Sequence, residues 1–219
     1  MMSSVEPIAP HQGFTLDVVV ASCRTLPAPG LNVIQRGHPN PRPAATLIPV
    51  IEVGGQAAVV LTRRTQGMDH GGDWVFPGGR LDDVDTSHAE AARRETAEEL
   101  GIAPDRIEVV GQLTTHGPII TGYVIEVFVG IVSGTEPLAP DAGEVSEIAT
   151  IPLIDFLQPG RFFRAPMDPA LRHPAESAPD IDLSDLRHYA IDDDHRLWGL
   201  QAEILCELLQ HLTGGTHDF

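Results

Sequence analysis

Three glutamates within five residues are the residues of this sequence whose spacing most directly suggests chemistry. In the run Arg94-Glu95-Thr96-Ala97-Glu98-Glu99-Leu100-Gly101-Ile102, Glu95 precedes Glu98 by three residues and Glu99 by four. Residues at these spacings are neighbours on a helix, where like charges repel by roughly a few tenths of a kcal/mol per pair. A hard divalent cation would neutralise the cluster, and carboxylate oxygens suit Mg²⁺ or Mn²⁺. We therefore predict a metal site here, against the alternative of a solvated helix face.

The helix that must position these glutamates has both of its ends marked in the sequence. It follows a glycine-rich turn, Phe76-Pro77-Gly78-Gly79. Ser87 and Glu90 form a capping-box pair at its start, and Gly101 stands where a left-handed C-terminal cap is expected. Arg94 lies four residues before Glu98, so it can orient a carboxylate of the cluster.

Several β-rich segments surround this helix. Two of them are joined by Gly54-Gly55, a strong hairpin signal. The expected strands are Thr46–Val53, Gln56–Thr62, Ile107–Leu113, Tyr123–Val132 and Val145–Ile151. One helix embedded among strands predicts an α+β fold, an α/β/α sandwich with a mixed central sheet, a helix after a glycine-rich loop and a C-terminal amphipathic helix.

The chain divides into four expected parts. Residues 1–44 form an N-terminal arm, 45–158 the core domain, 159–194 an irregular, proline-rich covering loop, and 195–219 a C-terminal helix packed on the core. That helix is expected over His195–Leu212, with leucines at core-facing spacing. If its leucines were exposed, a homodimer would be reasonable.

Composition limits the partners. The formal net charge is -17, and all 14 basic residues are arginine because the sequence contains no lysine. Such an acidic chain disfavours nucleic acid and anionic membranes, whose binding relies on basic residues. A phosphate-bearing substrate would need metal cations or arginines around it. No signal peptide or membrane span is predicted, and Cys23 and Cys206 give no disulfide or zinc pattern, so the expected location is the cytoplasm.

The chain is similar to the Nudix hydrolases, whose signature is G-x5-E-x7-R-E-U-x-E-E-x-G-U, with U an aliphatic residue. The second half of this box matches Arg94 to Ile102, except that Thr96 occupies the first U. In the first half, the box glutamate falls on Thr86 and one extra residue follows Gly79; Asp82 or Asp85 is a candidate replacement. The resemblance implies hydrolysis of a nucleoside diphosphate derivative.

The resemblance also implies roles for particular residues. Glu95 and Glu99 are the expected direct metal ligands, with Glu98 and the Gly79 carbonyl contributing. The general base is either Glu98 or Glu144. The remaining candidates are the phosphate-binding residues Arg63, Arg64 and Arg80, and the pocket-lining residues His70 and His116.

Within the family, the coenzyme A diphosphatase branch resembles most of this chain. Its likeness rests on the stretches Leu61–Thr65, Val75–Gly79, Thr121–Tyr123, Phe128–Gly130, Ile151–Leu153 and Leu197–Leu205. The branch signature L-R-x-H-x-G-Q is replaced by the shorter Met68–Trp74. The implied reaction converts coenzyme A or acyl-CoA to 3′,5′-ADP and (acyl-)4′-phosphopantetheine. The alternatives are hydrolysis of ADP-ribose, NADH or another nucleoside diphosphate derivative, and a ligand-binding domain without catalysis.

Overall fold

The computed structural model describes residues 13–33, 40–68, 70–117, 122–167 and 183–215. In this part of the chain the α-helices are α1 (Leu16–Cys23), α2 (His88–Leu100) and α3 (Gly199–Leu212), with 3₁₀ turns at Pro104–Arg106 and Leu153–Leu157. The strands are β1 (Leu31–Asn32), β2 (Arg42–Val53), β3 (Gln56–Arg64), β4 (Trp74–Val75), β5 (Gly78–Arg80), β6 (Ile107–Gln112), β7 (Thr115–His116), β8 (Tyr123–Val132), β9 (Val145–Pro152), β10 (Phe162–Ala165), β11 (Leu186–Ala190) and β12 (Arg196–Trp198).

A mixed sheet forms the centre of the molecule. Its main strand order is β1-β7-β8-β2-β3-β4, with β5 also paired to β2, β6 to β8 and β9 to β3. The long strands β2 and β8 run parallel, whereas β2 and β3 form an antiparallel hairpin. Gly54 and Gly55 turn this hairpin with φ values of 58° and 81°, a conformation that glycine adopts without strain. The predicted hairpin is therefore confirmed.

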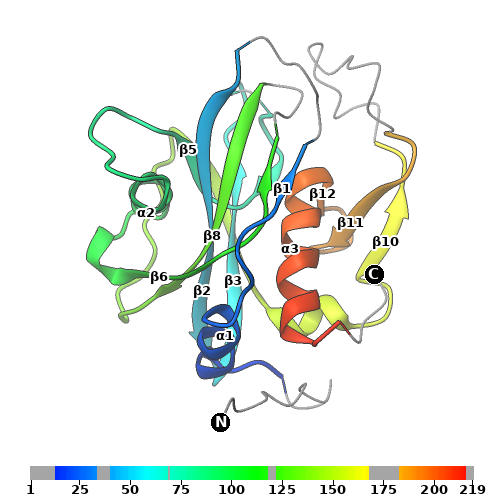
Figure 1. Ribbon diagram of the computed structural model, residues 1–219. Coiled ribbons are helices and arrows are strands. Elements are labelled where there is room, and N and C mark those ends of the chain that lie inside the picture. The colour runs from blue at the N-terminus through cyan, green and yellow to red at the C-terminus, as the bar shows by residue number, and fades with distance from the viewer. Residues whose placement is uncertain (1–12, 34–39, 69, 118–121, 168–182, 216–219) are drawn as a thin grey trace.

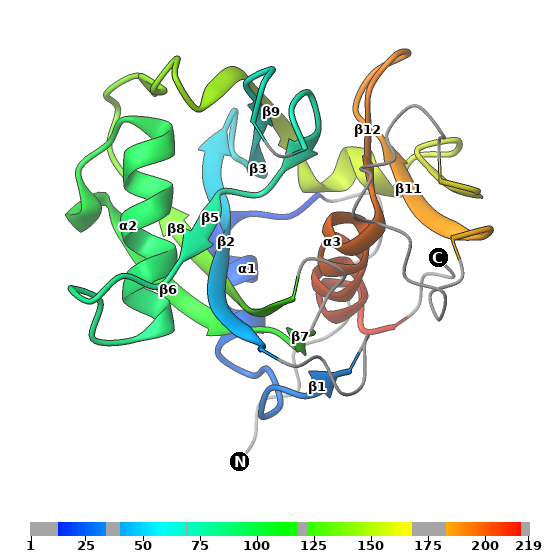
Figure 2. The ribbon, with the colours of Figure 1, turned by 90° about the horizontal axis from the view of Figure 1, so that it is seen from above.

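Helices cover both faces of this sheet, as Figures 1 and 2 show. Successive side chains of a strand point to opposite faces, so neighbouring residues of β2 enter different cores. Leu47 belongs to the core under α2, and Ile48 to the core under α1 and α3. The predicted α+β fold with an α/β/α sandwich is confirmed.

The ends of α2 follow the predicted signals with one difference. The Ser87 hydroxyl accepts a hydrogen bond from the Glu90 amide at 3.2 Å, and Gly101 closes the helix at φ 63°. The Glu90 carboxylate, however, accepts from the Thr86 amide at 3.0 Å rather than from Ser87. The reciprocal half of the capping box is thus shifted by one residue, because the Thr86 hydroxyl also donates to Glu90.

The expectation of irregular structure over residues 159–194 is wrong for two segments. Strands β10 and β11 pair antiparallel there, and β12 adds a third strand on the other side of β11. The buried ring of Tyr189 explains the pairing. Its centroid lies 5.7 Å from that of the Phe156 ring and 5.3 Å from that of the Phe162 ring. Residues 168–182 of this segment lie outside the described part.

Two predicted boundaries also move. Because β12 pairs with β11, α3 begins at Gly199 rather than at His195. At the other end of the chain, β2 begins at Arg42, inside the predicted N-terminal arm, where the Arg42 guanidinium lies 4.2 Å from the centre of the Tyr123 ring. The division into four parts is otherwise untested and stays a prediction.

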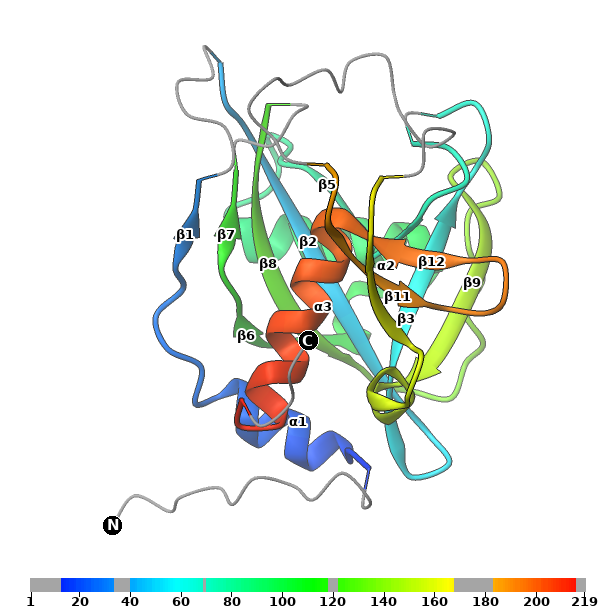
Figure 3. The same ribbon diagram turned by 90° about the vertical axis from the view of Figure 1, so that its right-hand side faces the viewer.

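The C-terminal helix is covered within the chain itself. Figure 3 shows α3 lying across the sheet, with β1 and β7 on one side and β10, β11 and β12 on the other. The buried residues of α3 are Ala202, Ile204, Leu205, Cys206, Leu208, Leu209 and Leu212. The premise for a homodimer, an exposed leucine face, is therefore wrong. In the described residues, no helix has the length and apolar character to cross a membrane.

Candidate active site

The glycine turn is fastened to the central strand of the sheet. The Thr46 hydroxyl donates to the Pro77 carbonyl at 2.8 Å, and the Leu47 amide donates to the same oxygen at 3.0 Å. A Cβ at Gly78 would lie 2.4 Å from the Ala45 carbonyl oxygen, closer than atoms can approach. Only glycine allows the backbone to pass there, which places the Gly78 amide against α2.

Glu99 is the most buried carboxylate of the cluster, with 5% of the residue exposed. One of its oxygens accepts from the Gly78 amide at 3.4 Å and the other from the Thr62 hydroxyl at 3.1 Å. Burial disfavours the charged form and raises the pKa of Glu99 to about 7, although these two hydrogen bonds and Arg64 oppose the shift. A cation would stabilise the ionised form in this position.

Glu95 lies directly on the second glycine of the turn. A Cβ at Gly79 would stand 2.4 Å from the Glu95 carboxyl carbon, so that glycine is required for the carboxylate to sit there. Burial is the largest effect on Glu95 and raises its pKa, while the hydrogen bond from Arg94 lowers it. The negative charges of Glu98 and Glu144 raise it further. Glu95, Glu99 and the glycine turn are therefore brought together as predicted.

Arg94 is held by Asp85. Its guanidinium donates to the two Asp85 oxygens at 3.0 and 2.9 Å, and the Asp85 side chain is 3% exposed. This paired geometry lowers the pKa of Asp85 and fixes the plane of the guanidinium. Asp82, with a side chain 70% exposed and 3.9 Å from Arg94, makes no comparable contact. Of the two candidate replacements for the box glutamate, Asp85 is therefore the one whose carboxylate is held against Arg94.

The other nitrogen of Arg94 points into the glutamate cluster. Nη1 donates to Glu95 at 2.9 Å and to Glu98 at 3.2 Å, so one guanidinium orients two of the three carboxylates. The Glu98 side chain is 60% exposed, in contrast to Glu99. Glu144 is exposed in the loop before β9, and no hydrogen bond or ion pair holds its side chain among the described residues.

The basic candidates fall into different environments. Arg64 lies close enough to Glu99 to lower its pKa, and Arg80 is exposed at the end of the glycine turn. Arg63 instead donates to the Gly72 carbonyl at 3.1 Å and to Glu147 at 2.5 Å. His70 pairs with Asp73 at 3.5 Å and adopts φ 59°. Arg63 and His70 therefore shape the loop between β3 and β4.

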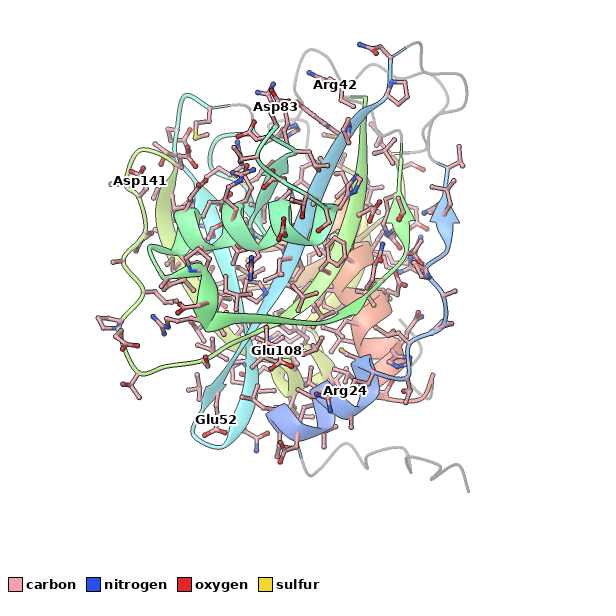
Figure 4. The ribbon with its side chains drawn as sticks, turned by 60° about the vertical axis from the view of Figure 1, so that its left-hand side comes forward. Arg24, Arg42, Glu52, Asp83, Glu108 and Asp141 are labelled. Atoms are coloured by element: carbon pink, nitrogen blue, oxygen red, sulfur yellow. The ribbon has the colours of Figure 1, made fainter. Side chains whose placement is uncertain are left out.

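Figure 4 places the loops that frame the site. Asp83, in the loop before α2, and Asp141, in the loop before β9, lie toward the same end of the molecule, away from Glu52 and Glu108. The Asp141 carboxylate accepts from the Gly143 amide at 2.8 Å and so shapes the turn before Glu144. This end of the sheet carries the candidate site.

Sequence reasoning missed three supporting residues. Thr46 holds the glycine turn, and Thr62 holds Glu99. Gln201, in the first turn of α3, accepts from the Phe76 amide at 3.0 Å and ties the opposite face of the sheet to the same turn. Threonines inside strands and a glutamine in a helix have no distinctive spacing. Thr62 and Gln201 lie in stretches that resemble the coenzyme A diphosphatase branch, but that resemblance does not single them out within the stretches.

The carboxylates of Glu95 and Glu99 are the kind of ligands that Mg²⁺ usually has in proteins. Among the described residues, no three His, Cys, Asp or Glu side chains form a preassembled metal cluster. Glu95 and Glu99 nevertheless present half-buried and buried carboxylates at one turn, and burial raises the pKa of both, so a cation would stabilise their ionised forms. Mg²⁺ typically takes one or two protein carboxylates and completes its coordination with water and substrate phosphates.

Comparison with known proteins identifies the class. The family model described as "NUDIX domain" matches residues 40–171, more than half of the chain. This chain belongs to the Nudix family and is a Nudix hydrolase, an enzyme acting on a diphosphate compound. Enzymes of this class typically use a divalent metal and act on small nucleotide derivatives.

The similar curated proteins are bacterial. A protein of Escherichia fergusonii named "Uncharacterized Nudix hydrolase NudL" is 36% identical over 176 residues, covering 80% of this chain and 85% of the relative. The protein of the same name from Salmonella paratyphi B is 37% identical over 170 residues, covering 77% and 82%. A solved MutT/nudix family protein of Enterococcus faecalis shares 18% identity and a TM-score of 0.48, covering 80% of this chain and 62% of that one.

Proposed function

We propose that this Nudix hydrolase cleaves the diphosphate linkage of coenzyme A or acyl-CoA, giving 3′,5′-ADP and (acyl-)4′-phosphopantetheine. The observation that carries the proposal is the bond from the Phe76 amide to Gln201. It joins two segments that resemble the coenzyme A diphosphatase branch, Val75–Gly79 and Leu197–Leu205, at the turn beside Glu95 and Glu99. Segments distant in sequence that meet at a reactive centre are well placed to act on one substrate.

Glu95, Glu98, Glu99 and the Gly79 carbonyl are the groups that would hold Mg²⁺ or Mn²⁺. When bound, such a cation neutralises charge on the diphosphate oxygens and acidifies a water molecule. Arg94 keeps Glu95 and Glu98 oriented through Asp85. Thr62 and the Gly78 amide keep Glu99 turned toward the glycine turn.

Glu144 is the better-supported general base of the two candidates. The Glu98 carboxylate accepts a hydrogen bond from Arg94 at 3.2 Å, so this side chain is already engaged by a fixed guanidinium. Glu144 has no such partner among the described residues, yet its charge acts on Glu95. A side chain near the cluster and not paired with arginine can take a proton from an attacking water.

Arginine side chains support the phosphate contacts. Arg64 lies near Glu99, and Arg80 stands exposed directly after the glycine turn. Guanidinium groups match phosphate oxygens in pairs, which suits a diphosphate. Arg63 and His70, committed to Glu147 and Asp73, support the neighbouring loop instead.

A substrate panel tests the proposal. Purified protein with Mg²⁺ or Mn²⁺ is assayed at alkaline pH against coenzyme A, acyl-CoA, ADP-ribose, NADH and dinucleoside polyphosphates. We expect the highest kcat/KM with coenzyme A or acyl-CoA. Higher activity on ADP-ribose or NADH would replace the substrate assignment, and no turnover on any compound would favour a ligand-binding domain.

A further inference from the structure

A row of polar side chains crosses α3 on the face of the sheet opposite the glutamate cluster. Glu203 and Glu207, one helical turn apart, have side chains 39% and 32% exposed. Arg187 of β11 donates to Glu203, and Thr114 donates to Glu207 through its amide at 2.9 Å and its hydroxyl at 2.8 Å. The row therefore combines residues from opposite sides of the helix.

His116 of β7 is aimed at this row. Its side chain is 5% exposed, and its Nε2 has no hydrogen-bond partner among the described residues. Nδ1 faces the Asn32 amide nitrogen at 3.4 Å; an amide nitrogen only donates, so Nδ1 accepts. In the neutral ring, which burial favours by lowering the pKa of His116, the proton is then on Nε2.

A buried donor thus faces an acceptor oxygen that receives no hydrogen bond from the described residues, at a distance too long for a direct bond. His116 Nε2 lies 4.0 Å from Glu207 Oε2, whereas hydrogen bonds require about 3 Å. One group that accepts from Nε2–H and donates to Oε2 would satisfy both, and a hydroxyl has that property. Glu203 Oε1 also accepts no hydrogen bond in the described part of the chain and suits an N–H donor.

The row shares helix α3 with Gln201, which accepts from the glycine turn. Glu203 and Glu207 follow Gln201 by two and six residues, an axial rise of about 3 and 9 Å at 1.5 Å per residue. Arg187 pairs with Glu203, and Arg164, which Asp185 engages, also lies near Glu203. Glu207 has no arginine partner among the described residues, so a phosphate is disfavoured beside it. The arrangement favours an uncharged group with hydroxyl and N–H donors.

We propose that His116, Glu203 and Glu207 form a binding subsite for the uncharged, hydroxyl- and amide-bearing part of the substrate. That part lies along α3 while the diphosphate lies at the glycine turn. The inference rests on the proposed function, in which pantetheine supplies such a part, and it assigns the substrate an orientation across the end of the sheet.

The test measures KM and kcat for coenzyme A in Glu207→Gln and Glu203→Gln. Each change removes an acceptor for a donor of the substrate, so KM should rise about tenfold while kcat stays within about twofold. Glu108→Gln is the matched control, because Glu108 is exposed on β6 and its carboxylate lies 3.9 Å from Arg24, its one side-chain partner among the described residues. Glu207 also holds Thr114, so Glu203→Gln tests the subsite even if Glu207→Gln destabilises the fold.

Calorimetric titration with pantetheine separates this inference from the proposed function. Wild-type protein should bind pantetheine, and the two variants should bind it about tenfold more weakly than Glu108→Gln. If that difference is found while no diphosphate is hydrolysed, the proposed function fails and the subsite stands. If hydrolysis proceeds but KM and pantetheine binding are unchanged in both variants, or wild type does not bind pantetheine, the subsite is overturned and the row binds solvent only.

Discussion

The two faces of the central sheet bury different kinds of surface. Under α2 the core is smaller, and the helix itself contributes the alanines Ala91, Ala92 and Ala97, whose small side chains bring the helix close to the sheet. Under α3 and α1 the core is larger and contains most of the leucines and aromatic rings. The close approach of α2 is what seats Glu95 and Glu99 on the glycine turn.

This difference separates chemistry from stability. The α2 face carries three glutamates on a thin core, and burial without full pairing raises the pKa of two of them. The α3 face supplies apolar burial, worth about 25 cal/mol per Å² of apolar surface. The enzyme can therefore tolerate electrostatic strain on one face because the other face is well packed.

The largest expected effect is a loss of stability when a core residue of α3 is truncated. Leu205 is fully buried, so Leu205→Ala should lower the free energy of unfolding by about 2–5 kcal/mol through lost transfer energy and a cavity. Denaturant titration measures this, with Gln210→Ala at an exposed position of the same helix as the control. A loss below about 0.5 kcal/mol would show that α3 is not the main stabilising layer.

The next substitution disturbs the polar contacts of the α2 face and leaves its apolar core intact. Asp85→Asn removes one charge from the pair that fixes Arg94, so the orientation of Glu95 and Glu98 is weakened. Removing groups that orient metal ligands typically costs about 10–100-fold in activity. Asp82→Asn is the matched control at an exposed carboxylate, and kcat/KM for both variants gives the result. Equal losses in the two variants would contradict the assignment of Asp85.

A third expected effect is a pH dependence of stability in metal-free protein. The pKa of Glu99 rises from 4.5 to about 7 on folding because of burial, so the folded state binds more protons in this interval. Its contribution to stability is complete below about pH 4.5 and is lost as the pH rises through about 7. Denaturant titrations in chelator should show this decline in wild type relative to Glu99→Gln. Parallel pH profiles would contradict the burial of an ionisable Glu99.

The α2 face was predictable from sequence because its signals are local. Ser87, Gly101 and the spacing of the three glutamates lie within fifteen residues, and each acts through the helix geometry alone. The hairpin at Gly54-Gly55 and the strand Tyr123–Val132 were predictable for the same reason. Local chemistry of this kind leaves few alternatives.

The rest depends on contacts between distant segments. Phe162 pairs with Tyr189 across a stretch of sequence rich in prolines. Because proline disfavours regular structure, the local sequence predicted an irregular loop there instead of β10 and β11. Asp85 was one of two candidates until the fold placed it, and not Asp82, against Arg94. Gln201 reaches Phe76 across 125 residues. Such partners are set by tertiary packing, which spacing along the chain does not reveal.

Binding of Mn²⁺ to the purified protein tests the central claim most directly, because it measures the glutamate cluster without any assumption about the substrate. Titration calorimetry measures the Mn²⁺ affinity of four proteins under one condition. These are wild type, Glu95→Gln, Glu99→Gln and the control Glu108→Gln. We expect binding by wild type and the control, and affinity lower by about 10–100-fold in the two cluster variants. Equal affinity in all four proteins would contradict a metal site at Glu95 and Glu99.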